Sequence, residues 1–204
     1  MSVLATAARV LIPVTLLSVV SACGDGHPLH PDPDLHAAHD LAPMPKQLQN
    51  LPLHGNTRGM VVGQVFPAPE GRCPPQLPVL FLYKGEGRAT HLGDFQVDGS
   101  ECVFMDPSNP LNMASGEGRF TWTAANGDEL RVAYDATTLS FAGPGSPWLN
   151  WRAPIYVTGG TGRFENATIT DVVWEGGANI VTFETYSSFD GWIAYQASDR
   201  HRKD

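Results

Sequence analysis

The feature of the chain that most restricts its fold is a run of alternating residues around a turn, EGRFTWTAANGDELRVAYDA at 117–136. Apolar side chains occupy every second position before the Asn-Gly-Asp turn at 126–128 and again after it. This period of two predicts strands with one buried face, because successive side chains of a strand point to opposite faces. Asn-Gly favours the tight turn of a β-hairpin. The run therefore predicts a hairpin that buries Trp122 from one strand and Tyr134 from the other.

The rest of the chain after residue 55 follows the same pattern. Short apolar or alternating runs, such as Val79–Tyr83, are separated by glycine and proline about every ten residues, and no run there has a helical period. About six to eight short strands with regular turns indicate an all-β sandwich or barrel. The alternation places these side chains on inward faces: Phe81, Tyr83, Phe95, Phe120, Trp122, Leu130, Val132, Tyr134, Val181 and Phe183.

The N-terminal segment has the features of a secretory signal. Arg9 is its only charge, Val10–Val20 is mostly apolar, and small residues precede Cys23. As a helix, Val10–Val20 would rise only about 16 Å, which is too short to cross a bilayer. Two interpretations remain open: a plain signal peptide followed by an incidental cysteine, or the signal of a lipoprotein.

The sequence Val20-Ser21-Ala22-Cys23 resembles the lipobox of bacterial lipoproteins. The resemblance implies that residues 1–22 are removed and that Cys23 becomes a lipidated N-terminus. Acyl chains add about 0.8 kcal/mol of membrane affinity per buried methylene, and more than one chain anchors stably. The expected location is the bacterial cell envelope, with the protein tethered to the lipid bilayer on the extracytoplasmic side of a membrane.

Length and charge limit the domain and its partners. The 182 residues left after removal of 1–22 suffice for one domain. The formal net charge of the full chain is −8, and the loss of Arg9 makes it −9. An acidic chain of this kind argues against a nucleic-acid partner. The short basic tail at 199–204 has an aspartate at each end and is expected to be solvated.

The cysteines predict one disulfide. If Cys23 carries lipid, Cys73 and Cys102 remain as an even pair, and a bond between them would close a loop of 30 residues. Outside the cytoplasm such a pair usually oxidises. The chain-entropy model gives roughly 3.6 kcal/mol of stabilisation for that loop. Two unpaired buried thiols are the alternative, and zinc is disfavoured because neither cysteine has C-x-x-C spacing.

Residues 23–54 are expected to form a disordered linker ahead of a β domain at 55–198. Between Gly24 and His54 the chain has six prolines, four aspartates and five histidines without an apolar period, so it cannot bury enough surface to fold. A histidine-rich tract in this linker could chelate zinc, copper or nickel weakly; it consists of His27, His30, His36 and His39 with Asp32, Asp34 and Asp40. Nothing rigid presents these ligands, so neither a formed metal site nor a cofactor is predicted.

The glycine cluster Gly159-Gly160-Thr161-Gly162 has two interpretations. A phosphate-binding loop would need a following helix, whose N-terminus holds the phosphate. The residues that follow, Phe164 to Trp174, are rich in threonine, valine and aromatic residues, which favour strands. The lysine of a P-loop is also missing. The glycines are therefore interpreted as a structural corner between two strands, where they allow positive φ.

Three stretches resemble the allene oxide cyclase and dirigent group of small β-barrels: Gly159–Ala167, Gly85–Phe95 and Gly118–Leu130. In that group a Gly-Gly-Thr-Gly corner is followed by an aromatic residue and then an alanine, as in GGTGRFENA here. The other two stretches are similar to bacterial secreted members, which form a lipoprotein branch. The resemblance implies an eight-stranded, antiparallel, closed barrel around a small apolar cavity, and assembly into homo-oligomers.

The resemblance also bears on function. Plant enzymes of the group steer a reactive apolar molecule to one stereochemical product, but their catalytic acidic residues have no residue-by-residue match here, so the catalytic residues stay unknown. We expect a membrane-anchored lipoprotein whose barrel binds a small apolar ligand or serves as an envelope scaffold. The alternative is an enzyme of the cyclase or dirigent type. An open cavity with convergent histidine, tyrosine or carboxylate groups would favour the enzyme, and a filled one the scaffold.

Four residues are candidates for the lumen of the barrel: His91, Trp122, Tyr134 and Phe183. His91 and Phe95 are an even number of residues apart, so in one continuous strand their side chains would lie on the same face. That face could bring the His91 imidazole beside the Tyr134 hydroxyl. Such a pair can take part in acid–base chemistry. The alternative is that His91 is hydrogen-bonded at a strand end and that Tyr134 is an ordinary core residue.

Overall fold

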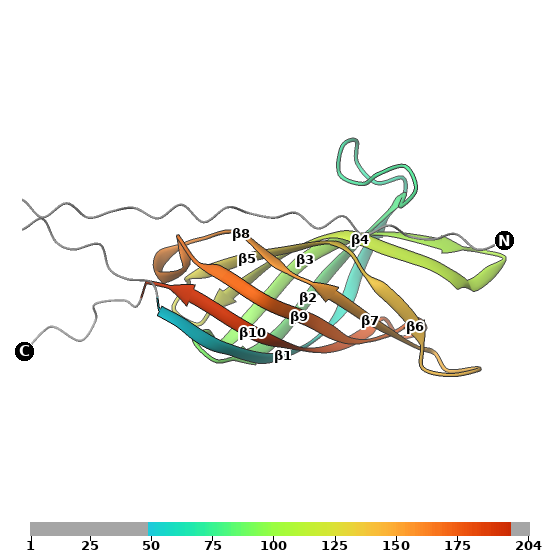
Figure 1. Cartoon of the computed structure of the whole chain (residues 1–204). Helices are drawn as coiled ribbons and strands as arrows, with labels where there is room; N and C mark the ends of the chain where they lie inside the picture. Colours follow the sequence, from blue (N-terminus) through green and yellow to red (C-terminus); the bar gives the residue numbers. More distant parts are fainter. Residues whose placement is uncertain (1–48, 197–204) are drawn as a thin grey trace, which may run out of the picture. The chain divides into compact units, whose positions relative to one another are not determined.

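The computed structural model describes residues 49–196 and shows an almost purely β structure there (Figure 1). Ten strands form one sheet in the order β6-β7-β9-β10-β1-β2-β3-β4-β5-β8. All neighbouring pairs are antiparallel. The strands are β1 (Gln49–Val65), β2 (Val79–Ala89), β3 (Gly93–Asp106), β4 (Asn109–Ala124), β5 (Glu129–Ala136), β6 (Thr138–Phe141), β7 (Trp148–Pro154), β8 (Tyr156–Gly160), β9 (Thr168–Asn179) and β10 (Glu184–Tyr195). The described part of the chain has one short 3-10 helix, η1 (Gly162–Phe164), and no helix long and apolar enough to cross a membrane.

The sheet curls into a half-barrel (Figure 1). The all-β prediction is confirmed, whereas the prediction of a closed eight-stranded barrel is wrong. The difference arises at two single residues, because Thr137 separates β5 from β6 and Ile155 separates β7 from β8. At Ile155 the chain changes neighbours: β7 pairs with β6 and β9, whereas β8 pairs with β5. Two long extended stretches thereby become four short strands, and the edge strands β6 and β8 do not pair with each other.

β1 starts before the predicted start of the domain at residue 55. It begins at Gln49 and pairs with β10 through twelve residue pairs. Leu53 is fully buried in the core, and Leu51 packs against the same core. Leu51 and Leu53 form a short alternating pattern at the end of a proline-rich segment, and the composition of that segment masks the pattern in the sequence. Residues 49–54 therefore belong to the sheet, while the signal, Cys23, the histidine-rich tract and the tail at 199–204 lie outside the described residues.

The core is an aromatic cluster inside the curl. The predicted hairpin is formed by β4 and β5, and it sets Trp122 opposite Leu130, with both side chains fully buried. The Trp122 ring stacks on Phe189 with centroids 4.6 Å apart and meets Trp174 edge-on at 5.5 Å. One residue from the predicted inward set differs, because Val181 lies in the β9–β10 turn and is 72% exposed.

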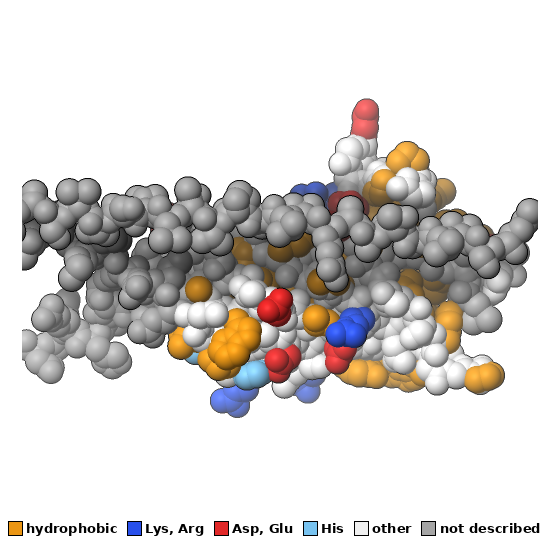
Figure 2. Space-filling model, in the orientation of Figure 1, with side chains coloured by type: hydrophobic (Ala, Val, Ile, Leu, Met, Phe, Trp, Pro, Cys, Tyr) orange, Lys and Arg blue, Asp and Glu red, His pale blue; other side chains and the backbone are white. Residues whose placement is uncertain are grey.

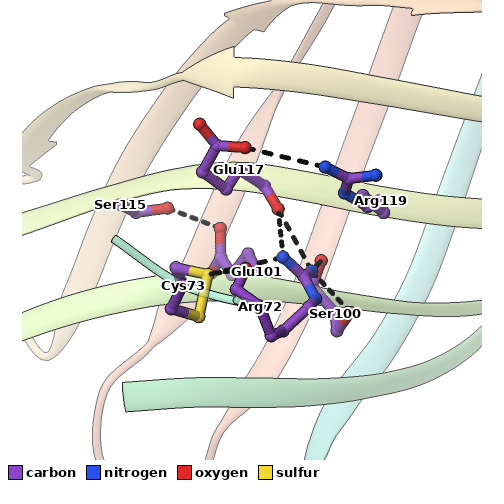
Figure 3. Close-up of a disulfide and its surroundings, with 8 residues drawn as sticks. Arg72, Cys73, Ser100, Glu101, Ser115, Glu117 and Arg119 are labelled. Carbon is purple, nitrogen blue, oxygen red and sulfur yellow. Dashed lines mark hydrogen bonds and ion pairs between the residues drawn. A yellow bond between two sulfur atoms is a disulfide. The ribbon is translucent and has the colours of Figure 1, made fainter. Parts of the chain in front are cut away.

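The segment 66–78, between β1 and β2, is fastened to the outer side of β3 and β4. The predicted disulfide between Cys73 and Cys102 is confirmed (Figure 3). Beside it, the Arg72 guanidinium donates to the Ser100 carbonyl at 3.2 Å, to the Ser100 hydroxyl at 2.8 Å and to the Glu117 carbonyl at 3.2 Å. One covalent bond and one guanidinium therefore hold this segment at the same place on the sheet.

The structure places the Gly-Gly-Thr-Gly sequence at the corner between β8 and β9. Gly162 has a φ of +57°, a conformation that favours glycine. A Cβ at Gly162 would also lie 2.0 Å from an Asp128 carboxylate oxygen. Thr161 links the corner to β5, because its hydroxyl accepts a hydrogen bond from the Glu129 N–H at 2.9 Å. Only the three-residue helix η1 follows the glycines, so the helix that a phosphate loop requires is missing at this corner.

Candidate functional site: a cavity inside the curled sheet

The curled sheet encloses a cavity of about 270 Å³. Its walls come mainly from large apolar side chains, including Phe81, Phe120, Trp151, Trp174 and Phe183. The outer face looks different, since charged side chains of both signs are scattered over the side of the molecule seen in Figure 2. Ligand sites in proteins are typically concave, mostly apolar and equipped with a few polar groups. The cavity has the size and lining of a site for a small molecule.

One polar group in the wall of the cavity is a carboxylate that accepts hydrogen bonds from three hydroxyls; the lining also contains other polar residues, among them Thr57, Asn179 and Ser187. Tyr83 of β2 donates to Oε1 of Glu101, a residue of β3. Tyr134 of β5 donates to Oε2 of the same carboxylate. Ser115 of β4 also donates to Oε2, at 2.5 Å, and its hydroxyl points toward Glu101 in Figure 3. Four adjacent strands thus contribute one side chain each to what we call the Glu101 cluster (Tyr83, Glu101, Ser115 and Tyr134).

An irregularity in β4 makes room for this cluster. Ser100 pairs with Arg119 and Cys102 pairs with Gly116, so Glu117 and Gly118 of β4 together face the single residue Glu101 of β3. Two residues opposite one define a β-bulge, and Glu117 has a φ of +50° there. A Cβ on Gly118 would lie 2.2 Å from the Tyr134 ring. The bulge and the missing side chain of Gly118 therefore let the Tyr134 ring lie flat over β4 and reach Glu101.

The charge of Glu101 is not neutralised by a nearby cation. Within residues 49–196 no lysine, arginine or histidine forms an ion pair with this carboxylate. Arg72 lies on the outer side of the bulge and directs its guanidinium to oxygens of Ser100 and Glu117. Burial, followed by repulsion from Arg119, lowers the pKa of Arg72 from its ordinary value. The cluster consequently presents a carboxylate stabilised by hydroxyl dipoles rather than by a counter-charge.

The two tyrosines of the cluster hold their protons more strongly than ordinary tyrosines. Burial is the main reason that the pKa of Tyr83 and the pKa of Tyr134 lie well above 10, and the negative charge of Glu101 raises both further. A protonated phenol donates to the carboxylate, whereas a phenolate would repel it. Both hydroxyls therefore remain hydrogen-bond donors throughout the physiological pH range.

The raised pKa values predict a loss of stability at alkaline pH. An unfolded tyrosine ionises near pH 10. Above that pH the unfolded chain loses the two protons while the folded chain keeps them, so the folded state binds more protons and the free energy of unfolding falls as the pH rises. The contribution is fully present below about pH 10. We expect an extra decline of up to about 1.4 kcal/mol per pH unit for each of the two tyrosines.

Urea unfolding between about pH 8 and pH 11 measures this decline. Tyr134→Phe should remove about half of the extra slope, whatever it does to the stability at neutral pH. Tyr186→Phe is the matched control, because Tyr186 is 52% exposed and lies outside the cluster. Equal slopes in the unmodified protein and in Tyr134→Phe would contradict the argument.

The predicted lumen residues occupy different places. Tyr134 and Phe183 line the cavity, whereas Trp122 lies in the closed aromatic core and does not. His91 does not form a pair with Tyr134, because it lies in the β2–β3 turn with a φ of +67°. Its Nε2 donates to the Pro52 carbonyl at 3.1 Å, and its Nδ1 accepts from the Tyr195 hydroxyl at 3.1 Å. This is the alternative considered above, a histidine hydrogen-bonded at a strand end.

Glu101 is the functional candidate that the sequence interpretation missed. It lies an even number of residues from the buried Phe95, Val97 and Val103 of β3, so its side chain falls on the inward face of the strand. A charged residue in this otherwise apolar inward-facing pattern was the sequence feature that could have identified it. The bulge opposite Glu101, which brings Tyr134 into reach, has no comparable signal in the sequence.

Within residues 49–196 no group of three or more histidine, cysteine, aspartate or glutamate side chains could hold a metal ion. The cysteines in this part of the chain are both used in the disulfide. The Glu101 cluster itself offers one carboxylate, two phenols and a serine hydroxyl.

Comparisons with known proteins give structural similarity only. No family model matches the sequence, and no curated protein matches it. Among solved structures, the chain is similar to the pterocarpan synthase dirigent protein PsPTS1, with 12% identity and a TM-score of 0.43 over 75% of this chain and 98% of that one. It is also similar to the pterocarpan synthase dirigent protein GePTS1, with 13% identity and a TM-score of 0.42 over 74% of this chain and 90% of that one. At such low identities the function has to be inferred from the cavity of the chain itself.

Proposed function

We propose that the protein binds a small, mostly apolar ligand inside the curled sheet. The observation that carries this proposal is the cavity of about 270 Å³, which is lined mainly by aromatic and aliphatic side chains and contains the Glu101 cluster. That volume lies near the lower end of the range for small-molecule sites, about 300–1,000 Å³. An apolar ligand gains affinity by removing surface from water, and the polar cluster sets its orientation.

A variant that fills the cavity tests this proposal. Ala178 lines the cavity and is small, so Ala178→Phe should place a ring in the space that the ligand needs. Ala114→Phe is the matched control, because Ala114 is exposed on the outer face of β4. Propylbenzene is a suitable neutral probe, and the fluorescence of Trp151 and Trp174 in the cavity wall reports its binding.

We expect saturable binding of propylbenzene to the unmodified protein and to Ala114→Phe. Binding to Ala178→Phe should weaken by roughly tenfold or more, which corresponds to about 1.4 kcal/mol. Native mass spectrometry after mild extraction would show whether a ligand is already bound. The proposal fails if the unmodified protein does not bind the probe, or if Ala178→Phe binds it equally well.

An enzyme of the cyclase or dirigent type is the second candidate function. The Glu101 cluster favours it, because a carboxylate at the wall of an apolar cavity, held in place by two phenols, can accept a proton from a bound substrate. A binding protein releases its ligand unchanged, whereas an enzyme releases a product. Product analysis after incubation with a reactive apolar substrate therefore separates the two candidates.

The location in the cell forms part of the proposal. The lipobox-like sequence ending at Cys23 supports anchoring to the bacterial cell envelope by lipid. The disulfide between Cys73 and Cys102 supports an oxidising compartment outside the cytoplasm. In this proposal the cavity faces the extracytoplasmic space and is held near a membrane.

A further inference from the structure

We propose that the cavity selects ligands that carry a cationic amine on an apolar body, with Glu101 as the anion that pairs with the amine. This inference rests on the proposed ligand-binding function and adds the chemical class of the ligand. It follows from three features of the cavity: the direction of its hydrogen bonds, its uncompensated charge and its aromatic walls.

The hydrogen bonds of the Glu101 cluster leave mainly acceptor atoms for a ligand. Tyr83, Ser115 and Tyr134 each use their single O–H to donate to the Glu101 carboxylate. A carboxylate has about four lone-pair positions, and each hydroxyl oxygen keeps its own lone pairs. A ligand group that reaches the cluster therefore has to donate a hydrogen. On the neighbouring wall, the Trp174 indole N–H donates to the Ser187 hydroxyl at 2.6 Å, so this donor is already used.

The acidic residue in the lining of the cavity is Glu101. The lining also contains two cationic residues, but their head groups are exposed and each is paired with a carboxylate outside the cavity: Arg58 with Glu86 at 2.5 Å and Lys84 with Asp98 at 3.0 Å. Glu101 has no cation within ion-pair distance among the described residues. An ammonium group beside Glu101 would therefore form an ion pair that a neutral ligand cannot form. A charged donor also makes a stronger hydrogen bond to a carboxylate than a neutral donor does.

The aromatic walls favour the same ligand. Trp174 contacts two other rings of the cavity wall: its ring centroid lies 4.8 Å from that of Phe120 and 5.2 Å from that of Trp151. Tyr134 and Tyr83 flank Phe120 at 5.9 Å and 5.8 Å. The faces of aromatic rings attract cations within about 6 Å, and tryptophan does so most strongly. An amine beside Glu101 would have these rings around it and its apolar body along the rest of the wall.

Three probes of similar shape separate charge from hydrogen bonding and from apolar burial. 2-Phenylethylamine is protonated at neutral pH, as lysine is. 2-Phenylethanol offers a neutral donor, and propylbenzene offers none. Dissociation constants for all three are measured on the unmodified protein by calorimetry or tryptophan fluorescence. We expect the amine to bind roughly tenfold more tightly than the alcohol, the fold-change that corresponds to about 1.4 kcal/mol.

The outcomes for this inference and for the proposed function are distinguishable. If the alcohol or propylbenzene binds as tightly as the amine, the amine inference is overturned and the ligand-binding function stands. If none of the three binds, the ligand-binding function fails as well. These comparisons use the unmodified protein, so they decide the question even if a variant does not fold.

The variant Glu101→Gln then tests whether Glu101 is the residue that causes the preference for the amine. This change keeps the shape of the side chain and removes its charge, and it should abolish the advantage of the amine over the alcohol. Binding of propylbenzene by the variant shows that its cavity is still formed. Glu175→Gln is the matched control, because Glu175 is exposed on β9, lies 3.6 Å from Arg152 and does not line the cavity. An amine preference that survives in Glu101→Gln would overturn the role of Glu101.

Discussion

Replacing Trp122 with alanine is expected to lower the free energy of unfolding by roughly 3–5 kcal/mol, as large-to-small changes of buried aromatic residues do. Trp122 is fully buried and lies between three other rings, with centroid distances of 4.6 Å to Phe189, 5.5 Å to Trp174 and 5.5 Å to Phe95. Alanine would leave a void that this rigid β core cannot fill. Urea unfolding followed by far-ultraviolet circular dichroism measures the loss.

Trp122→Phe is the control for this prediction. The indole N–H of Trp122 is buried and has no hydrogen-bond partner. An unpaired buried donor costs about 1–3 kcal/mol, and phenylalanine removes it while keeping an aromatic ring in the core. Trp122→Phe should therefore cost much less than Trp122→Ala. Equal losses for the two variants would show that ring packing is not what Trp122 contributes.

Replacing Cys23 with serine is expected to move the protein from the membrane fraction to the soluble fraction. The physical reason is that a serine hydroxyl cannot take the thioether-linked lipid, and acyl chains contribute about 0.8 kcal/mol per buried methylene. Fractionation of cells followed by immunoblotting measures the shift.

Two further samples make the anchoring experiment decisive. Ser21→Ala keeps the cysteine and a small residue before it, so this variant should remain with the membranes. Washing the membranes at high salt removes proteins that are held only by charge. If the Cys23→Ser variant still sediments with membranes after that wash, the protein is not held by lipid on Cys23.

Much of the fold could be predicted because alternation and turn residues act locally. Trp122 and Leu130 face each other across the β4–β5 hairpin, and the Asn-Gly turn between them sets that register. Cys73 and Cys102 could be paired because they form an even pair once Cys23 is set aside for the expected lipid. The hairpin could be predicted from a few neighbouring residues, and the disulfide from the number of cysteines.

What could not be predicted depends on pairing between distant strands. The change of neighbours at Ile155, which divides one extended stretch into β7 and β8, depends on where β5 and β9 lie. The Glu101 cluster depends on the bulge at Glu117, which shifts the register of β4 against β3 by one residue. The alternation of the sequence places His91 on the same strand face as Phe95, but the chain turns at His91. Across a turn, the spacing between two residues no longer tells which face each side chain occupies. Local patterns do not contain these long-range registers.

The pairing of β1 with β10 has a consequence for the order in which the protein can be made. Gln49 lies opposite Tyr195, so the first described strand receives one of its two neighbours from the last. Contacts so far apart in sequence form slowly, and an unpaired strand edge is prone to bind other chains. Until β10 has emerged from the ribosome, β1 therefore has β2 beside it and an open edge on the other side. A chain that stops after β9 never acquires the strand that covers this edge.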